Sequence, residues 1–355
     1  MKRVRIGLLG CGTVGGGFVR LVNHERGRIR ARFGVDLDIT RILVRDLQKE
    51  RVGVSRSLLT TNALEVIDGD CDVIVEVVGG VHSAGAYVRR ALARGLDVVT
   101  ANKALLAASG VELFDAATLA RAEIGFEASV CGAVPVIGVL RRALSGDSVE
   151  SITGILNGTS NYVLCRMDEG YAFADAVTRA QELGFAEADP SLDLRGEDAA
   201  QKLAVLAQLA FEVPVRHTTV VGIEDITPAM IADARRDGFV IRQIADVRRV
   251  AGGVAIVVEP RRLPSAHRLA KIEDEQNAVV IRSRAAGELF LSGRGAGSMP
   301  TASAVLSDVI AIAERWRLRR LSRERLAPVF AEHGGETPPV QPAGTPALNH
   351  ARDLT

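Results

Sequence analysis

A glycine motif that directly follows an apolar run at the N-terminus is the feature that most constrains the fold. The run is "RVRIGLL" at 3–9, and the motif "GCGTVG" at 10–15 has the spacing G-x-G-x-x-G and opens a helix-like segment. In such a motif the first glycine permits a tight turn, the second lets the backbone approach a pyrophosphate, and the third lets helix and strand pack closely. Because the motif stands between a strand and a helix, it predicts a dinucleotide site in preference to a purely structural turn.

The rest of the chain divides into two regions by its hydrophobic pattern. Short apolar strands alternate with helices as far as about Pro135, which predicts a doubly wound parallel sheet. Beyond it, we expect helices at 135–145, 158–184 and 197–212. Several strand-like runs there alternate with period two, which is typical of a sheet with one covered face. The predicted fold class is α/β, with an N-terminal Rossmann-type doubly wound parallel sheet plus an α+β catalytic and dimerisation domain. We expect these domains at 1–135 and 136–297, a helix at about 298–314 that returns to the first domain, and a basic helix and flexible tail at 315–355.

Composition excludes several classes of protein. A formal net charge of +1 provides no bulk field that would recruit nucleic acid or an anionic membrane. No apolar run approaches the ~18 residues of a membrane span, and the N-terminus lacks the features of a signal peptide, so we expect a cytoplasmic protein. The four cysteines are widely spaced, which predicts buried free thiols rather than a zinc site or disulfides.

Lysine is rare enough in this chain to be informative. Only five of the 44 basic residues are lysines. Arginine cannot exchange a proton near neutral pH, whereas a desolvated lysine can. Lys103 follows a predicted strand at the edge where such sheets bind ligands, and Asp198 and Lys202 share one face of a predicted helix. Each feature also has a purely structural alternative. Lys103 could be a surface lysine on a turn, and Asp198 with Lys202 could be a helix ion pair worth about 0.3–0.5 kcal/mol. Burial lowers the pKa of a lysine and a nearby carboxylate raises it, so the sequence leaves the direction of the shift at Lys202 open.

The choice between NAD and NADP depends on the second predicted strand. An acid about 20 residues after the motif favours NAD, and Asp36 and Asp38 lie near that position. They stand at the start of the strand, however, whereas the ribose is expected beyond its carboxyl end, where the residue is Arg45. Arg45, with Lys49, suits a 2′-phosphate. We therefore expect NADP, with NAD as the alternative.

Six motifs in order make the chain resemble the homoserine dehydrogenase family over roughly residues 3–312. They are "GLLGCGTVGGG", "VVTANKALLA", "FEASVCGAVPVI", "GILNGTSNYVL", "GFAEADPSLDLRGEDAAQKL" and "GRGAGSMPTASAVLSD". The resemblance implies reversible NAD(P)-dependent oxidation of L-homoserine to L-aspartate 4-semialdehyde, in the biosynthesis of threonine, methionine and isoleucine. The alternatives are another NAD(P)-dependent amino-acid or semialdehyde oxidoreductase and a non-catalytic NADP-binding sensor.

The resemblance also implies roles for particular residues. Lys202 would be the general acid/base, supported by Asp198 and Lys103. The substrate would be bound by Glu187, Asp193, Gly158 and Thr159. The cofactor would be lined by Gly10, Gly12, Thr13, Val14, Gly15, Arg45, Thr100, Lys103, Gly295 and Gly297. A monovalent cation such as sodium would be held by main-chain oxygens of Glu127, Val130, Gly132 and Val134.

Two further expectations come from the same resemblance. Many relatives carry a regulatory amino-acid-binding domain after the catalytic part, and the residues left here are too few for one, so direct feedback by threonine at such a domain is not expected. Two-domain dehydrogenases with a sheet-rich second domain can pair through that sheet, so we expect a homodimer or a higher homo-oligomer. The Arg-rich segment "ERWRLRRLSRERL" receives no role beyond a solvated or subunit-contacting helix.

Overall fold

The computed structural model describes residues 2–211 and 213–325, with side chains as far as Trp316. The described residues as far as Trp316 form one compact unit, and residues 317–325 fall outside it. The basic helix and flexible tail were expected together at 315–355. Of that segment, residues 326–355 lie outside the described residues, and residues 315–325 form the end of α11 (Ser298–Arg325).

The first sheet is parallel and six-stranded, in the order β3-β2-β1-β4-β5-β6. Its strands are β1 (Lys2–Leu9), β2 (Val35–Leu43), β3 (Leu59–Thr60), β4 (Val73–Glu76), β5 (Asp97–Thr100) and β6 (Ile124–Gly125). Its helices are α1 (Thr13–Phe33), α2 (Ala63–Ile67), α3 (His82–Ala93) and α4 (Lys103–Ala120). The order reverses between β1 and β4, and ligands bind such sheets in the crevice at the carboxyl ends of the strands at that point. The predicted Rossmann-type fold is confirmed.

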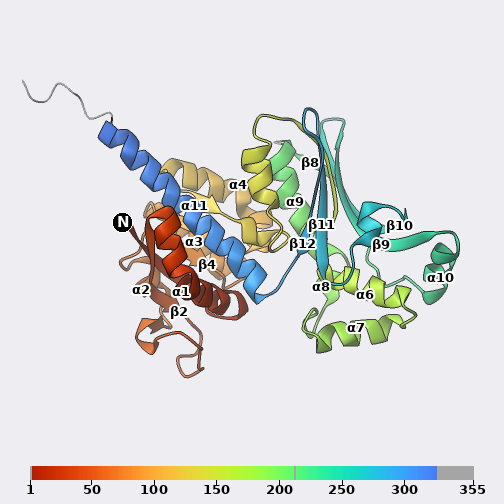
Figure 1. The fold of residues 1–355 in the computed structure, drawn as a ribbon, viewed down its shortest axis with the longest axis horizontal. Coiled ribbons are helices and arrows are strands. Elements are labelled where there is room, and N and C mark those ends of the chain that lie inside the picture. Colours follow the sequence, from red (N-terminus) through yellow and green to blue (C-terminus); the bar gives the residue numbers. More distant parts are fainter. Residues whose placement is uncertain (1, 212, 326–355) are drawn as a thin grey trace, which may run out of the picture. The chain divides into compact units, whose positions relative to one another are not determined.

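Alternate side chains of each central strand pack on opposite faces of this sheet. In β4, Val75 contacts the cluster that contains Phe18 of α1, and Ile74 contacts the cluster that contains Leu105 of α4. The first cluster also holds Ala302 and Val305 of α11. Helix α11 thus packs against the first sheet and lies beside α1 (Figure 1).

The second sheet is mixed, in the order β12-β11-β7-β9-β10-β8. Its strands are β7 (Val149–Ile155), β8 (Val215–Val220), β9 (Phe239–Val250), β10 (Gly253–Pro264), β11 (Gln276–Ser283) and β12 (Gly287–Arg294). The helices of this region are α5 (Val136–Gly138), α6 (Gly158–Asp168), α7 (Phe173–Glu182), α8 (Ser191–Leu194), α9 (Glu197–Phe211) and α10 (Pro228–Arg236). Neighbouring strands are antiparallel except β8 and β10, which are parallel.

Helix α9 joins the two sheets. Its Leu203 and Leu206 belong to one buried cluster with Val247 of β9 and Leu113 of α4. This packing places the polar start of α9 against the start of α4. The candidate site is built at that junction.

The structure differs from the predicted elements in three places. The helical pattern at 158–184 is two helices, because Gly170 takes a left-handed conformation with φ of 100° and ends the first. The helix expected at 135–145 is α5 followed by a π-helical turn, η3 (Val139–Ala143). The strand β8 and helix α10 were not predicted, because β8 is largely exposed and has little apolar pattern.

Some expectations about composition can be compared with the structure. All four cysteines are free thiols, and three of them are buried as predicted, whereas Cys11 is only partly buried. Within the described residues, no group of three or more His, Cys, Asp or Glu side chains could hold a metal ion. Among the same residues, no helix is both long and apolar enough to cross a membrane.

The glycine motif is required by close packing at two of its positions. Gly10 has φ of 102°, a conformation that L side chains rarely adopt. A Cβ atom on Gly15 would lie 2.1 Å from the carbonyl oxygen of Gly10, so α1 can start against the turn only without a side chain there. A Cβ atom on Gly16 would meet nothing closer than the end of the Arg20 side chain at 3.8 Å.

These contacts predict opposite effects for two neighbouring substitutions. Gly15→Ala should destabilise the protein by about 1–3 kcal/mol, because the backbone must move to relieve the clash. Gly16→Ala should be neutral or stabilising by up to about 1 kcal/mol, because alanine favours the helix. Urea unfolding measures both, and equal stability of the two variants would contradict the packing argument.

Candidate active site

The glycine turn leaves its centre open toward the expected pyrophosphate. Gly12 precedes α1, and a Cβ atom there would meet no atom within 4 Å. The Ser298 hydroxyl donates to the Thr13 carbonyl at 2.7 Å, which places the start of α11 beside the turn. Gly297, expected to line the cofactor, directly precedes Ser298. The structure thus brings the start of α11 to the glycine turn, although Thr13 and Ser298 are 285 residues apart in the sequence.

Buried polar contacts fix the neighbouring strand ends. The Thr100 hydroxyl donates to the carboxylate of Glu76 at 2.6 Å, and the backbone N–H of Val78 donates to the other oxygen at 2.9 Å. The Asn102 side chain accepts from Leu105 N at 3.1 Å and so caps α4, whose first residue is Lys103. Glu76 is fully buried and was not predicted as a site residue, because nothing in the sequence separates it from other acids at strand ends.

One carboxylate holds two lysines at the centre of the site. Asp198 Oδ1 lies 2.9 Å from Lys103 Nζ, and Asp198 Oδ2 lies 2.7 Å from Lys202 Nζ. Lys202 also donates to the carbonyl of Leu156 at 2.8 Å. The side chains of Asp198 and Lys202 are 8% and 12% exposed, against 35% for Lys103. The ion pair of Asp198 and Lys202 is therefore largely desolvated, whereas an ordinary surface ion pair on a helix would be exposed to solvent.

The charges in this cluster reinforce each other. Burial opposes ionisation of Asp198, but Lys202 and Lys103 outweigh it and hold the pKa of this carboxyl well below its ordinary value. Burial also opposes the charge of Lys202, but the adjacent Asp198 outweighs it and raises the pKa of the amine. The sequence left the direction of the pKa shift at Lys202 open, and in the structure this pKa is raised, so Lys202 rests as an ammonium.

An asparagine connects this cluster to a second buried carboxylate. The Asn157 Nδ2 donates to Asp193 Oδ1 at 2.6 Å and to Asp198 Oδ2 at 2.8 Å. Its Oδ1 accepts from Ser160 N at 2.7 Å and caps α6. Burial and the nearby charge of Asp198 raise the pKa of Asp193. Asn157 was missed as a site residue, although an asparagine just before a helix signals a cap.

The other predicted substrate residues are Gly158 and Thr159, which follow Asn157 in the chain, and Glu187. Gly158 begins α6, and a Cβ atom there would lie 2.5 Å from the Glu275 carbonyl oxygen. The Thr159 hydroxyl donates to the Phe185 carbonyl at 2.8 Å. Glu187 is exposed between α7 and α8, and its carboxylate makes no ion pair among the described residues.

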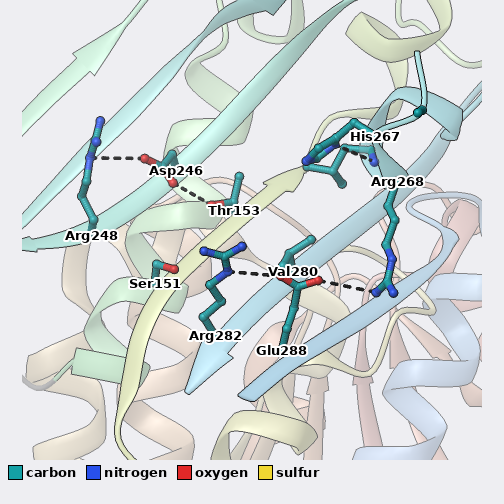
Figure 2. Close-up of a pocket in the computed structure, with 11 residues that line it drawn as sticks. Ser151, Thr153, Asp246, Arg248, His267, Arg268, Val280, Arg282 and Glu288 are labelled. Carbon is teal, nitrogen blue, oxygen red and sulfur yellow. Dashed lines mark hydrogen bonds and ion pairs between the residues drawn. The ribbon is translucent and has the colours of Figure 1, made fainter. Parts of the chain in front are cut away.

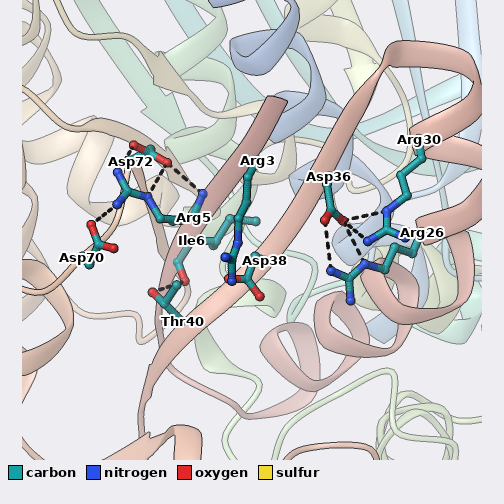
Figure 3. A network of polar contacts seen from close by, with 10 residues as sticks. All are labelled: Arg3, Arg5, Ile6, Arg26, Arg30, Asp36, Asp38, Thr40, Asp70 and Asp72. Carbon is teal, nitrogen blue, oxygen red and sulfur yellow. Dashed lines mark hydrogen bonds and ion pairs between the residues drawn. The ribbon is translucent and has the colours of Figure 1, made fainter. Parts of the chain in front are cut away.

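The two acids that would favour NAD are engaged elsewhere (Figure 3). Asp36 accepts from Arg26 and Arg30, and Asp38 accepts from Arg3. The hydrogen bonds from Arg30 and Arg26 lower the pKa of Asp36 to about 2. Both acids stand at the amino end of β2, away from its carboxyl end. Arg45, beyond the carboxyl end of β2, is exposed.

The segment expected to hold a cation lies between β6 and α5, where the chain leaves the first sheet. Cys131 and Gly132 take consecutive left-handed conformations, with φ of 58° and 54°. A Cβ atom on Gly132 would lie 2.5 Å from the carbonyl oxygen of Gly295, so the two predicted glycines meet there. The Glu127 carboxylate accepts from the backbone N–H groups of Ile137 and Gly138 at 2.8 and 2.7 Å. The side chain of Glu127 is thus used to cap α5.

The fold and the site together define a class of protein. A sheet with an open glycine turn ends beside a buried carboxylate that holds two lysines, and this combination is typical of NAD(P)-dependent oxidoreductases.

Comparisons with known proteins narrow the class to a family. A family model described as homoserine dehydrogenase matches residues 135–310, and one described as the NAD-binding domain of homoserine dehydrogenase matches residues 10–127. A homoserine dehydrogenase of Bacillus subtilis is 39% identical over 338 residues, covering 94% of this chain and 78% of that protein. The chain belongs to the homoserine dehydrogenase family, which are NAD(P)-dependent oxidoreductases that act on CH–OH groups.

Solved structures agree with this assignment. A crystal structure of a homoserine dehydrogenase from Thiobacillus denitrificans is similar with a TM-score of 0.86 and 38% identity, covering 92% of this chain and 76% of that one. A hyperthermophilic archaeal homoserine dehydrogenase in complex with NADPH is similar with a TM-score of 0.77 and 29% identity, covering 88% of this chain and 98% of that one.

The electrostatic account of Lys202 predicts the effect of removing the charge of Asp198. In Asp198→Asn, burial acts on Lys202 without the opposing carboxylate, so the pKa of Lys202 should fall below the ordinary value of about 10.4. Heteronuclear NMR of the lysine Nζ groups measures this titration, and the chain has only five lysines to assign. Glu197→Gln, at the exposed neighbouring acid, is the control and should leave the titration unchanged. An unchanged titration in Asp198→Asn would show that this carboxylate does not set the protonation of Lys202.

Proposed function

We propose that this protein interconverts L-homoserine and L-aspartate 4-semialdehyde, with Lys202 as the general acid/base. The observation that carries the proposal is the buried Lys202 ammonium held by Asp198 and by the carbonyl of Leu156. These two acceptors fix the nitrogen at the junction of the two sheets. A substrate oxygen placed beside it could exchange a proton with a group whose position is already determined.

The chemistry requires one proton and one hydride to leave the substrate. Oxidation converts the C4 hydroxyl to a carbonyl, and the nicotinamide, when bound, accepts the hydride from C4. The neutral amine of Lys202 takes the hydroxyl proton and becomes an ammonium. In the reverse direction the ammonium, which is the resting form, returns the proton to the carbonyl oxygen. Because the pKa of Lys202 is raised, oxidation should accelerate with rising pH, whereas reduction should not.

Carboxylates without a basic partner support an ammonium-bearing substrate. Among the described residues, neither Asp193 nor Glu187 has a Lys or Arg within ion-pair distance. Asp193 accepts from Asn157 but has a raised pKa, so a cation beside it would be stabilising. We assign the substrate ammonium to Asp193 and Glu187, and the other polar atoms of the substrate to the backbone around Gly158 and Thr159.

Two features support NADP as the preferred cofactor. Asp36 and Asp38 lie toward the amino end of β2 and are paired with arginines there, whereas the ribose is expected at the carboxyl end, so neither is placed to bind a ribose hydroxyl. Arg45 is exposed beyond the end where the ribose is expected. The glycine turn, Thr100 and Gly297 would contact the remainder of the dinucleotide.

A monovalent cation fits the backbone between β6 and α5. Among the described residues, the carbonyls of Val130 and Gly132 accept no hydrogen bond, so both remain free to bind an ion. The carbonyls of Glu127 and Val134 accept one backbone N–H each, from Val130 and Val136, and a carbonyl oxygen has two lone pairs. An ion held here would fix the connection between the region at 1–135 and the region at 136–297, which we propose as cofactor and substrate domains.

The face of the second sheet opposite α9 is the proposed surface for a second copy of the chain. It carries an open groove of about 610 Å³ (Figure 2). Charges of both signs line it, with Arg282 and Arg268 beside Glu288 and Arg248 beside Asp246. A twofold-related surface must complement itself, and alternating charges allow that.

Removal of the Lys202 amine tests the proposed reaction. Lys202→Ala should lower kcat for homoserine oxidation by about 10²–10⁴-fold, because the general base is lost. The variant should also lose the rise of rate with pH, while binding NADP as the native protein does. Steady-state kinetics across pH measure these effects, and Lys271→Ala, at an exposed lysine, is the control. Near-normal turnover of Lys202→Ala would remove the assigned role.

The proposed pairing is tested by the mass in solution. Light scattering after gel filtration should give at least twice the mass of one chain. Arg282→Glu should lower that mass toward the monomer, because it places a like charge beside Glu288. Arg56→Glu, at an exposed arginine near the first sheet, should not. A monomeric native protein, or a full-size Arg282→Glu assembly, would contradict this surface.

A further inference from the structure

A single arginine ties the loop after β2 to the glycine turn. Arg51 Nη1 donates to the carbonyls of Asp46 and Lys49 at 3.0 and 2.7 Å, and so closes the loop on itself. Arg51 Nε donates to the carbonyl of Cys11 at 3.4 Å, and Cys11 is the second residue of the glycine motif. The half-buried guanidinium therefore stands between the loop beyond β2 and the turn that begins α1.

This guanidinium retains unused donors. It carries N–H groups at Nε, Nη1 and Nη2, and the bonds described use Nε and Nη1. Among the described residues, Nη2 donates to no acceptor. The loop is closed and tied to the glycine turn by Nε and Nη1 alone, so the Nη2 N–H groups remain available to bind a ligand. A planar guanidinium that is already fixed loses little freedom when it binds a phosphate.

The surroundings of Arg51 favour an anion. Arg45 and Lys49 belong to the same segment and are exposed. Arg20 of α1 lies across the turn, where it donates to Ser298 Oγ at 3.2 Å. Of the two acids of the loop, Asp46 uses one carboxylate oxygen to accept from Gln48 N at 2.7 Å, and Glu50 is exposed next to Arg51. The four basic groups, on Arg20, Arg45, Lys49 and Arg51, outnumber the two acidic groups where the 2′-substituent of the ribose is expected.

We propose that Arg51 determines cofactor specificity by giving the 2′-phosphate a second guanidinium beside Arg45, in a loop that the same side chain holds closed. This inference rests on the proposed preference for NADP. It adds a residue that the sequence motifs do not identify, and it explains why one side chain contacts both the loop and the glycine turn.

Calorimetric binding of two cofactor fragments tests the proposal without turnover. The probes are 2′,5′-ADP and 5′-AMP, which differ by the 2′-phosphate alone. The native protein should prefer 2′,5′-ADP. Arg51→Ala should lower the affinity for 2′,5′-ADP by roughly tenfold or more, as expected for loss of a hydrogen bond to a charged group. Affinity for 5′-AMP should change much less, and it also reports that the variant is folded.

Two further variants separate geometry from charge. Arg51→Lys should bind 2′,5′-ADP with intermediate affinity, because it keeps the charge and loses the fork. Arg56→Ala removes an exposed arginine from the same connection between β2 and β3 and should bind both probes normally.

The outcomes distinguish this inference from the cofactor assignment. A native protein without preference for 2′,5′-ADP would overturn both the NADP assignment and the role of Arg51. A native preference that survives in Arg51→Ala, or equal weakening of both probes in that variant, would overturn the role of Arg51 alone.

Discussion

The contact between the Asp198 carboxylate and two lysines is the interaction on which the site depends. Desolvating charges costs several kcal/mol per ion, and their attraction offsets this only when the remaining donors and acceptors are also satisfied. Here the carbonyl of Leu156 accepts from Lys202, and the Asn157 amide donates to Asp198. The Asp198 carboxylate is therefore both paired and hydrogen-bonded, and it can persist in a buried position. The same pairing keeps Lys202 protonated at rest.

The fold supplies the members of this cluster from separate helix starts. Lys103 begins α4, Asn157 caps α6, and Asp198 lies in the first turn of α9. Apolar packing of α9 against α4 and the second sheet brings the three starts together. Contacts far from any ligand, such as Leu206 against its neighbours in this core, thus determine the distances between charged groups. The network of Glu76 and Thr100 fixes the strand ends on the cofactor side in a similar way.

Local patterns in the sequence predicted much of this arrangement. The glycine motif and the alternation of strands and helices indicated the parallel sheet, and the scarcity of lysine singled out Lys103 and Lys202. The spacing of Asp198 and Lys202 on one helix is local, so it could also be predicted. The contact between Lys103 and Asp198 could not, because it depends on how α4 and α9 pack. For the same reason the sequence left the pKa direction of Lys202 open and did not identify Asn157, Glu76 or Arg51.

The central claim is that this site removes a proton and a hydride from an alcohol that also carries an ammonium. Comparison of L-homoserine with 4-hydroxybutyrate tests it most directly, since the second compound has the same hydroxyl and carboxylate without the amino group. The measurement is the absorbance of reduced nicotinamide formed from NADP, and then from NAD, by the purified protein. The account predicts rapid formation with L-homoserine and almost none with 4-hydroxybutyrate. Equal rates with both compounds, or no reaction of L-homoserine with either cofactor, would contradict it.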